Sequence, residues 1–496
     1  MSSFAQRCGV HDAARESAVL DVARTICESH FELVRVAWCD VHGHARSKVL
    51  VAAAAERALR SGVTMVSTLM LKDLAGHTVY KVFEPGGTES LPGFGQANNL
   101  VLLPDPTSLR RLPWAESTGW LRADLHFTDG GPVELDPRRV LLRAIERLAA
   151  AGLGMQCGLE VEFHIYRIET RPGCIDPRLD PDNTSTPGVP GCVSMVHPGA
   201  NMLSEQWFDQ AEVPLRIVQR TAQALGLPLL SLEAEMGPSQ VEAVFDVTDA
   251  LTAADNMSLF RNAVKMALQR AGYHATFMCR PPFPNIMSSG WHLHQSLVNT
   301  ADGSNVFRRS APAPGSTVLD AGHTLSALGG HYLAGLLHHA AGMTVFSTPT
   351  VNGYGRFRPN ALAPQSILWG RDSRGAMLRV IGECGDQDTR IENRIGEPAA
   401  NPYLYIASQI HAGLDGIAKE LAPPRATDAP YGAQAQRLPS SLGEALAALA
   451  ADSALVLAFG QPFVDYYSRI KRCDLQRFDE AQDKDLFHRR EYFGRL

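Results

Sequence analysis

The chain has 496 residues, of which 45% are hydrophobic and 20% are charged, and its formal net charge is −6. This length predicts two or more domains with at least one large core, and the lack of a long lysine- and arginine-rich run argues against a nucleic-acid partner. The sequence shows no signal peptide, no run of 18 apolar residues and no C-x-x-C pair among its nine cysteines. We therefore expect a reduced cytoplasmic protein with no membrane partner.

The first part of the chain has the pattern of a small α+β unit. In chain order the residues predict a helix over 18–28, strands over 31–38 and 45–51, a helix near 52–61 and a short buried strand over 100–103. The turn residues Asp129, Gly130 and Gly131 mark a change of pattern. We therefore expect a first domain over 1–128 and a second domain over 129–496.

The second part begins with a helix. Asp136 and Pro137 are typical of a helix N-terminus, and Gly152 ends the apolar spacing that follows. A strand over 158–166 comes next, and a stretch over 171–200 that is rich in Pro, Gly and Asp indicates a long irregular loop. Further helices are predicted over 204–225, 253–272, 325–340, 403–420 and 441–459.

The strand over 158–166 alternates apolar and polar residues without a break. Because every second side chain of a strand shares a face, Glu160 and Glu162 would stand side by side, about 7 Å apart. Two carboxylates held this close repel each other, so a proton or a metal ion usually lies between them. The alternative interpretation is a half-buried strand with a solvated acidic face.

Several later stretches are similar in kind. Glu235 and Glu242 flank a Gly-Pro turn, and a hairpin there would bring them to one end of a sheet. His292 and His294 share one strand face, which is a moderate signal for metal binding. The other charged candidates are Arg356, Arg374, Arg379, Arg390, Glu392 and Arg394. Taken singly, these features are also typical of an acidic turn, a surface ion-pair row or a solvated charged surface.

Taken together, the candidates favour one kind of chemistry. Oxygen-rich ligands suit Mg²⁺ or Mn²⁺ rather than zinc, and arginines suit phosphate and carboxylate groups. Carboxylates, divalent ions and arginines are the groups that phosphoryl transfer from a nucleotide requires. Neither a P-loop nor a kinase glycine-rich loop is present in the sequence, so we expect a different nucleotide-binding fold.

The order and spacing of these motifs resemble the glutamine synthetase family from about residue 20 to the C-terminus. The resemblance rests on Gly158-Leu-Glu-Val-Glu-Phe, Glu235 to Glu242, Gly290-Trp-His-Leu-His, Asn352-Gly-Tyr-Gly-Arg, Trp369-Gly-Arg-Asp-Ser-Arg, Arg390-Ile-Glu-Asn-Arg and Asn401-Pro-Tyr-Leu. It implies an α+β protein with an N-terminal β-grasp domain and a catalytic domain built from an antiparallel sheet with flanking helices. It also implies a homo-oligomer, a dodecamer of two stacked hexameric rings, with active sites between neighbouring subunits.

The resemblance also implies roles for the candidate residues, with ATP and two Mg²⁺ or Mn²⁺ ions at each site. One ion, nearer the amino-acid substrate, would be held by Glu162, Glu235 and Glu242. The other, nearer the nucleotide, would be held by Glu160, His292 and Glu392. Nucleotide contacts would come from His294, Ser296, Arg379 and Arg390, and glutamate contacts from Glu162, Arg356 and Arg394. Arg374 would act on the transferring phosphoryl group.

The implied reaction phosphorylates the γ-carboxylate of glutamate and then replaces phosphate by an amine. At the amine end the sequence departs from an ammonium-binding enzyme, because Leu362, Val66 and Met287 stand where the family has polar residues. We therefore expect an aromatic amine as acceptor, as in the γ-glutamylanilide synthetases of aromatic-amine breakdown. The alternatives are an alkylamine or polyamine ligase, an ordinary glutamine synthetase, and a catalytically inactive relative with a structural or regulatory role.

Overall fold

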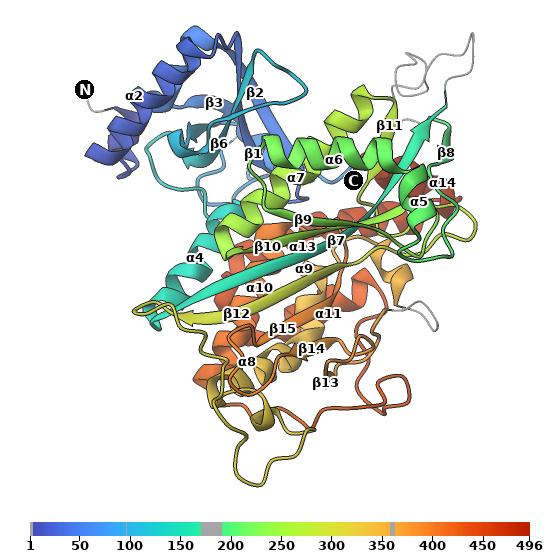
Figure 1. The fold of residues 1–496 in the computed structure, drawn as a ribbon. Coiled ribbons are helices and arrows are strands. Elements are labelled where there is room, and N and C mark those ends of the chain that lie inside the picture. Colours follow the sequence, from blue (N-terminus) through green and yellow to red (C-terminus); the bar gives the residue numbers. More distant parts are fainter. Residues whose placement is uncertain (1–2, 96, 170–190, 358–362) are drawn as a thin grey trace.

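The computed structural model describes residues 3–95, 97–169, 191–357 and 363–496. These residues form two sheets, one of six strands near the N-terminus and one of nine strands in the rest of the chain. In Figure 1 the nine-stranded sheet crosses the middle of the molecule, and the N-terminal unit lies beside it. The mixed α+β fold with two sheets confirms the expected fold class.

The N-terminal sheet has the strand order β2-β1-β6-β4-β3, and β5 pairs with β6. The strands are β1 (Leu33–Cys39), β2 (Ala45–Val51), β3 (Val63–Val66), β4 (Asn99–Pro104), β5 (Arg110–Arg111) and β6 (Thr118–Phe127). The helices are α1 (Phe4–Arg7), α2 (Ala13–Glu28) and α3 (Ala55–Ser61). The helix α2 begins earlier than predicted because the side chain of Asp12 caps it, accepting a hydrogen bond from the backbone amide of Arg15.

The large sheet has the order β13-β14-β15-β12-β7-β10-β9, and both β8 and β11 pair with β7. Its strands are β7 (Leu153–Ile168), β8 (Val193–Met195), β9 (Leu229–Ala234), β10 (Gln240–Asp249), β11 (Tyr273–Thr276), β12 (Trp291–Asn299), β13 (Trp369–Arg371), β14 (Leu378–Ile381) and β15 (Arg390–Gly396). All pairs except β13–β14 are antiparallel. The core face of β7 buries Leu159, Val161 and Phe163, as the alternation predicted.

The remaining helices pack around this sheet, and Figure 1 shows α10 and α13 behind it. They are α4 (Pro137–Ala150), α5 (Glu205–Gln210), α6 (Glu212–Ala224), α7 (Ala250–Arg270), α8 (Ala327–His338), α9 (Ala340–Ser347), α10 (Pro402–Ala418), α11 (Leu442–Ala451), α12 (Ser453–Phe459), α13 (Gln461–Glu480) and α14 (Lys484–His488). Among the described residues no single helix is long and apolar enough to span a membrane, and α11 with α12 passes that test only as a pair bent by 86°.

The structure corrects several predicted boundaries. The helix predicted over 204–225 is interrupted at Ala211, and the helix predicted over 441–459 is interrupted at Asp452, which caps α12 by accepting from the backbone amide of Leu455. Part of the predicted loop over 171–200 is wrong, because β8 adds a short strand to β7; residues 170–190 lie outside the described ranges. The long helix α13 follows the last helix that the sequence predicted.

A buried histidine links the junction of α8 and α9 to α10 and to the start of α12. His339 lies between α8 and α9, and its Nδ1 and Nε2 atoms lie 2.7 Å from Asp452 Oδ2 and 2.9 Å from Asp415 Oδ2. Burial alone would lower the pKa of this imidazole, but the two carboxylates raise it above its ordinary value. The two carboxylates therefore favour the protonated form of His339, which joins α10 to the start of α12.

This ion pair predicts a pH-dependent contribution to stability. Because the pKa of His339 is higher in the folded chain, its contribution is complete below about pH 6.5 and is lost as the pH rises through the folded-state pKa. We expect His339→Leu to destabilise the protein by roughly 2 kcal/mol at pH 6 and by less at pH 9. Melting temperatures at both pH values, with the exposed neighbour His338→Leu as control, test this. An equal loss at both pH values would contradict it.

Candidate active site

Four neighbouring strands bring the predicted carboxylates and imidazoles to one face of the large sheet. In the pairing of β7 with β10, Glu162 lies opposite Glu242, and in the pairing of β7 with β12, Glu160 lies opposite His292. In the pairing of β12 with β15, His294 lies opposite Glu392. Cross-strand neighbours point to the same face of a sheet. The register therefore gathers residues that lie more than 200 positions apart in the sequence.

The side chains form two groups that could each hold an ion. Glu160, His292 and Glu392 form the first group, with His292 Nδ1 at 3.1 Å from Glu160 Oε2 and 3.7 Å from Glu392 Oε1. Glu162, Glu242 and His292 form the second, with His292 Nε2 at 3.8 Å from Glu162 Oε1. Within each group one donor atom from every residue lies within 4.8 Å of the others.

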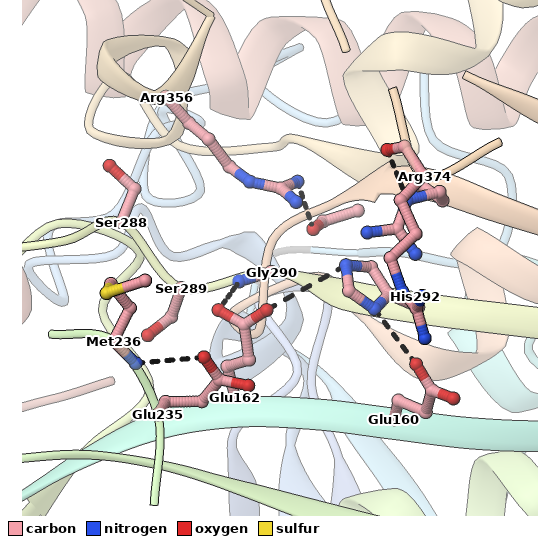
Figure 2. A network of polar contacts seen from close by, with 12 residues as sticks. Glu160, Glu162, Glu235, Met236, Ser288, Ser289, Gly290, His292, Arg356 and Arg374 are labelled. Carbon is pink, nitrogen blue, oxygen red and sulfur yellow. Dashed lines mark hydrogen bonds and ion pairs between the residues drawn. The ribbon is translucent and has the colours of Figure 1, made fainter. Parts of the chain in front are cut away.

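The sequence placed Glu235 where the second group has His292. Glu235 follows the end of β9, and its Oε2 atom accepts a hydrogen bond from the backbone amide of Met236. Figure 2 shows it beside Glu162, and its charge helps to raise the pKa of that carboxyl. Glu235 is thus a neighbour of the second group, although the structure does not include it among the mutually close donor atoms of the described residues.

The electrostatics of the site favour a bound cation. Burial, together with the charges of Glu162 and Glu160, raises the pKa of Glu242 to about 10. Burial and the charge of Glu235 raise the pKa of Glu162 to about 7. Carboxyl groups with such pKa values must either keep protons or share a positive ion. Because oxygen donors dominate, the donor set fits Mg²⁺ or Mn²⁺.

The histidine in the middle of the site is held neutral. Burial, and after it the charge of Arg394, lowers the pKa of His292 to about 4. A neutral imidazole has a free nitrogen lone pair, which a metal ligand requires. In contrast, hydrogen bonds from His292 and His294 hold the pKa of Glu160 below its ordinary value despite its burial. The first group therefore combines an ionised carboxylate with a neutral imidazole.

Arginines surround the carboxylates. Both Arg379 and Arg394 form ion pairs with the fully buried Glu392, and Arg394 Nε also donates to the backbone carbonyl of Arg374. Arg356 donates to the carbonyl of Gly396 over 2.9 Å. Figure 2 shows Arg356 and Arg374 on the side of the carboxylates that faces away from β7. The arrangement can therefore hold an anionic substrate against the carboxylate groups.

A cavity of about 560 Å³ opens beside the first group. It is lined by four of the predicted nucleotide-side and metal residues, Glu160, His294, Ser296 and Arg390, and by apolar side chains of β10 such as Val244. Arg390 donates from Nε to His294 Nδ1 over 3.2 Å. A cavity of this size and mixed lining is typical of a small-molecule site. Arg379 lies outside this lining and contacts Asp372 and Glu392 instead.

The structure describes two of the three residues that the sequence predicted for the amine pocket. Met287 packs against Gly237, beside the turn between Glu235 and Glu242, where a Cβ atom on Gly237 would lie 2.9 Å from the Met287 Cβ. Val66 ends β3 in the N-terminal sheet and is 39% exposed. Leu362 lies outside the described residues. Of the two described residues, Met287 and Val66, the structure therefore brings Met287 to the site within one subunit.

Comparisons with known proteins agree with the resemblance that the sequence motifs showed. A family model described as the catalytic domain of glutamine synthetase matches residues 134–489. The chain is 39% identical over 482 residues to a gamma-glutamylanilide synthase of Acinetobacter, covering 94% of this chain and 93% of that protein. It is 32% identical to a gamma-glutamylethanolamide synthetase of Streptomyces coelicolor, covering 78% of each. A solved GmaS–ADP complex superimposes with a TM-score of 0.74 at 28% identity, covering 95% of this chain and 98% of that one.

The crowded carboxylates predict how stability depends on pH and on divalent ions. Since the pKa of Glu242 rises from its ordinary 4.5 to about 10 on folding, the folded chain holds the extra proton, and stability falls as the pH rises between these values. In protein treated with EDTA we expect the melting temperature to fall from pH 6 to pH 9 and to recover with Mg²⁺ or Mn²⁺.

Glu242→Gln should raise the melting temperature of the EDTA-treated protein at pH 9 and remove most of the gain from added ions. Glu146→Gln is the matched control, since Glu146 is an exposed carboxylate on α4 whose ion pair is with Arg139. If Glu242→Gln keeps the full gain from Mn²⁺, the ligand role of Glu242 is wrong.

Proposed function

This chain belongs to the glutamine synthetase family and is a glutamate–amine ligase of that family, and from this premise we propose that its acceptor is an aromatic amine. One observation carries the proposal: the chain has clustered carboxylates and an imidazole suited to hold ions, while the residues predicted for its amine pocket, Met287, Val66 and Leu362, are all apolar. The similarity to a gamma-glutamylanilide synthase over almost the whole chain supports it.

The chemistry proceeds in two steps. An oxygen of the glutamate γ-carboxylate attacks the γ-phosphorus of ATP, the bond to ADP breaks, and γ-glutamyl phosphate forms. The amine nitrogen then attacks the acyl carbon, phosphate leaves, and the nitrogen loses a proton. Holding the reactants in line supplies several kcal/mol of the rate enhancement, and stabilising the charge on the phosphoryl oxygens supplies most of the rest.

Each group of residues has a proposed part in these steps. Glu162, Glu235 and Glu242 would hold one divalent ion, and Glu160, His292 and Glu392 the other; bound ions supply charge neutralisation at the phosphate oxygens. The nucleotide would lie in the cavity, against His294, Ser296 and Arg390, with Arg379 nearby. Arg356 and Arg394 would bind the glutamate carboxylate, and Arg374 would contact the transferred phosphoryl group.

The apolar amine end decides which acceptor fits. Ammonium and alkylamines arrive charged, and they need a carboxylate both to bind them and to take a proton before attack. An aromatic amine is neutral near pH 7 and gains about 25 cal/mol per Å² of ring surface buried against apolar walls. A site without polar partners for ammonium should also reject it. A catalytically inactive relative is disfavoured because the ligand and arginine sets are intact.

A comparison of acceptors tests this assignment. We expect kcat/KM with glutamate and ATP to be highest for aniline, lower for a simple alkylamine and lowest for ammonium. Leu362→Glu should shift the order toward the charged amines, whereas Leu362→Ile, which keeps the site apolar, should not. Phosphate release and product mass give the readout. If ammonium is the best acceptor of the wild type, the chain is an ordinary glutamine synthetase.

We also propose the assembly that the family implies, a dodecamer of two hexameric rings. The exposed, apolar Val66 supports this, since in the family the N-terminal domain completes a neighbour's site. Light scattering or mass photometry should therefore find twelve subunits, and dilution to monomers should abolish activity. A fully active monomer would contradict the shared site.

A further inference from the structure

Gln240 is a buried amide in the middle of the carboxylate site. It is the first residue of β10, two positions before Glu242, and it is 2% exposed. Strand pairing places it opposite His164, on the face that also carries Glu162. A side-chain amide this deeply buried must satisfy its donors and its acceptor within the protein.

The hydrogen bonds of Gln240 define its orientation. The backbone amide of Gly237 donates to Gln240 Oε1 over 2.9 Å, so the NH₂ group must point the other way. Gln240 Nε2 then donates to Glu162 Oε2 over 2.9 Å and to Ser289 Oγ over 3.1 Å. A flipped amide would bring two acceptors together on the Glu162 side, which makes the observed orientation the only satisfied one.

These bonds divide the two oxygens of Glu162 between different tasks. Glu162 Oε2 accepts from Gln240 Nε2 and also from the backbone amide of Gly290, both over 2.9 Å. Glu162 Oε1 points to the other side, 3.8 Å from His292 Nε2, as Figure 2 shows. Oε2 is thus occupied by two donors, and Oε1, which faces His292, is the oxygen left for the second group of candidate ligand residues.

We propose that Gln240 is a positioning residue that holds Glu162 so that this carboxylate binds a divalent ion through Oε1 alone. The inference rests on the proposed metal-binding role of Glu162 and is independent of which amine is the acceptor. A hydrogen bond to an ionised carboxylate is stronger than a neutral one. Loss of such an outer partner of a metal ligand typically weakens metal binding 10- to 100-fold.

The test compares Gln240→Met with Gln295→Met. Gln295 is a matched control because it is also a buried glutamine of this sheet, 1% exposed, and it contacts Gln409 and Tyr332 rather than a carboxylate. Mn²⁺ binding to EDTA-treated protein is followed by electron paramagnetic resonance. We expect Gln240→Met to weaken the binding of one of the two ions about 10- to 100-fold. Gln295→Met should bind both ions as tightly as the wild type does.

Kinetics separate positioning from a general structural effect. In Gln240→Met the apparent KM for Mn²⁺ should rise, while kcat at saturating Mn²⁺ recovers most of its wild-type value. Gln240→Asn, which keeps the amide but shortens its reach, should give an intermediate loss and serves if Gln240→Met does not fold. If both Gln240 variants bind Mn²⁺ with wild-type affinity, the proposed positioning role of Gln240 is wrong, whereas the proposed metal site stands. If the wild type itself binds no Mn²⁺, both the proposed metal site and the proposed role of Gln240 are wrong.

Discussion

The whole site depends on one constraint, the repulsion between carboxylates that the large sheet buries on a single face. Glu160 and Glu162 are neighbours on β7, and Glu242 lies directly opposite Glu162 on β10. Placing such groups together is unfavourable unless positive charge or protons compensate for it, which is why the pKa values of Glu162 and Glu242 rise. Such a cost is typical of a functional site, and in the proposed function the bound divalent ions would supply the missing positive charge.

The surrounding residues make the buried carboxylates differ from one another. His292 is kept neutral and so has one nitrogen lone pair to offer an ion, while Arg394 and Arg379 neutralise Glu392. Gln240 and the Gly290 amide hold one oxygen of Glu162. Each carboxylate therefore differs from its neighbour in protonation, in partner or in the oxygen that it presents. In the proposed site, such differences would suit two ions held a short distance apart rather than one at the centre.

The predicted amine pocket differs from the rest of the site in how it would recognise its substrate. In the proposed mechanism, phosphate and carboxylate groups would be recognised by charge. The proposed acceptor would instead be selected by what the site lacks, since Met287 and the other predicted residues of the amine pocket offer no carboxylate for a cation.

The sequence by itself determined the strand β7, because strict alternation over 158–166 is local information, and it predicted most helices for the same reason. It also supplied the candidate residues, since His292 and His294 or Glu235 and Glu242 signal their chemistry by type and spacing. Only the tertiary structure decided which of them meet, because register pairs Glu162 with Glu242 and Glu160 with His292 across distant segments. It alone placed His292 in both ion groups, broke the helices at Ala211 and Asp452, and added β8. Gln240 was passed over because a glutamine carries no charge signal; its role comes from burial and hydrogen-bond geometry, which exist only after the chain has folded.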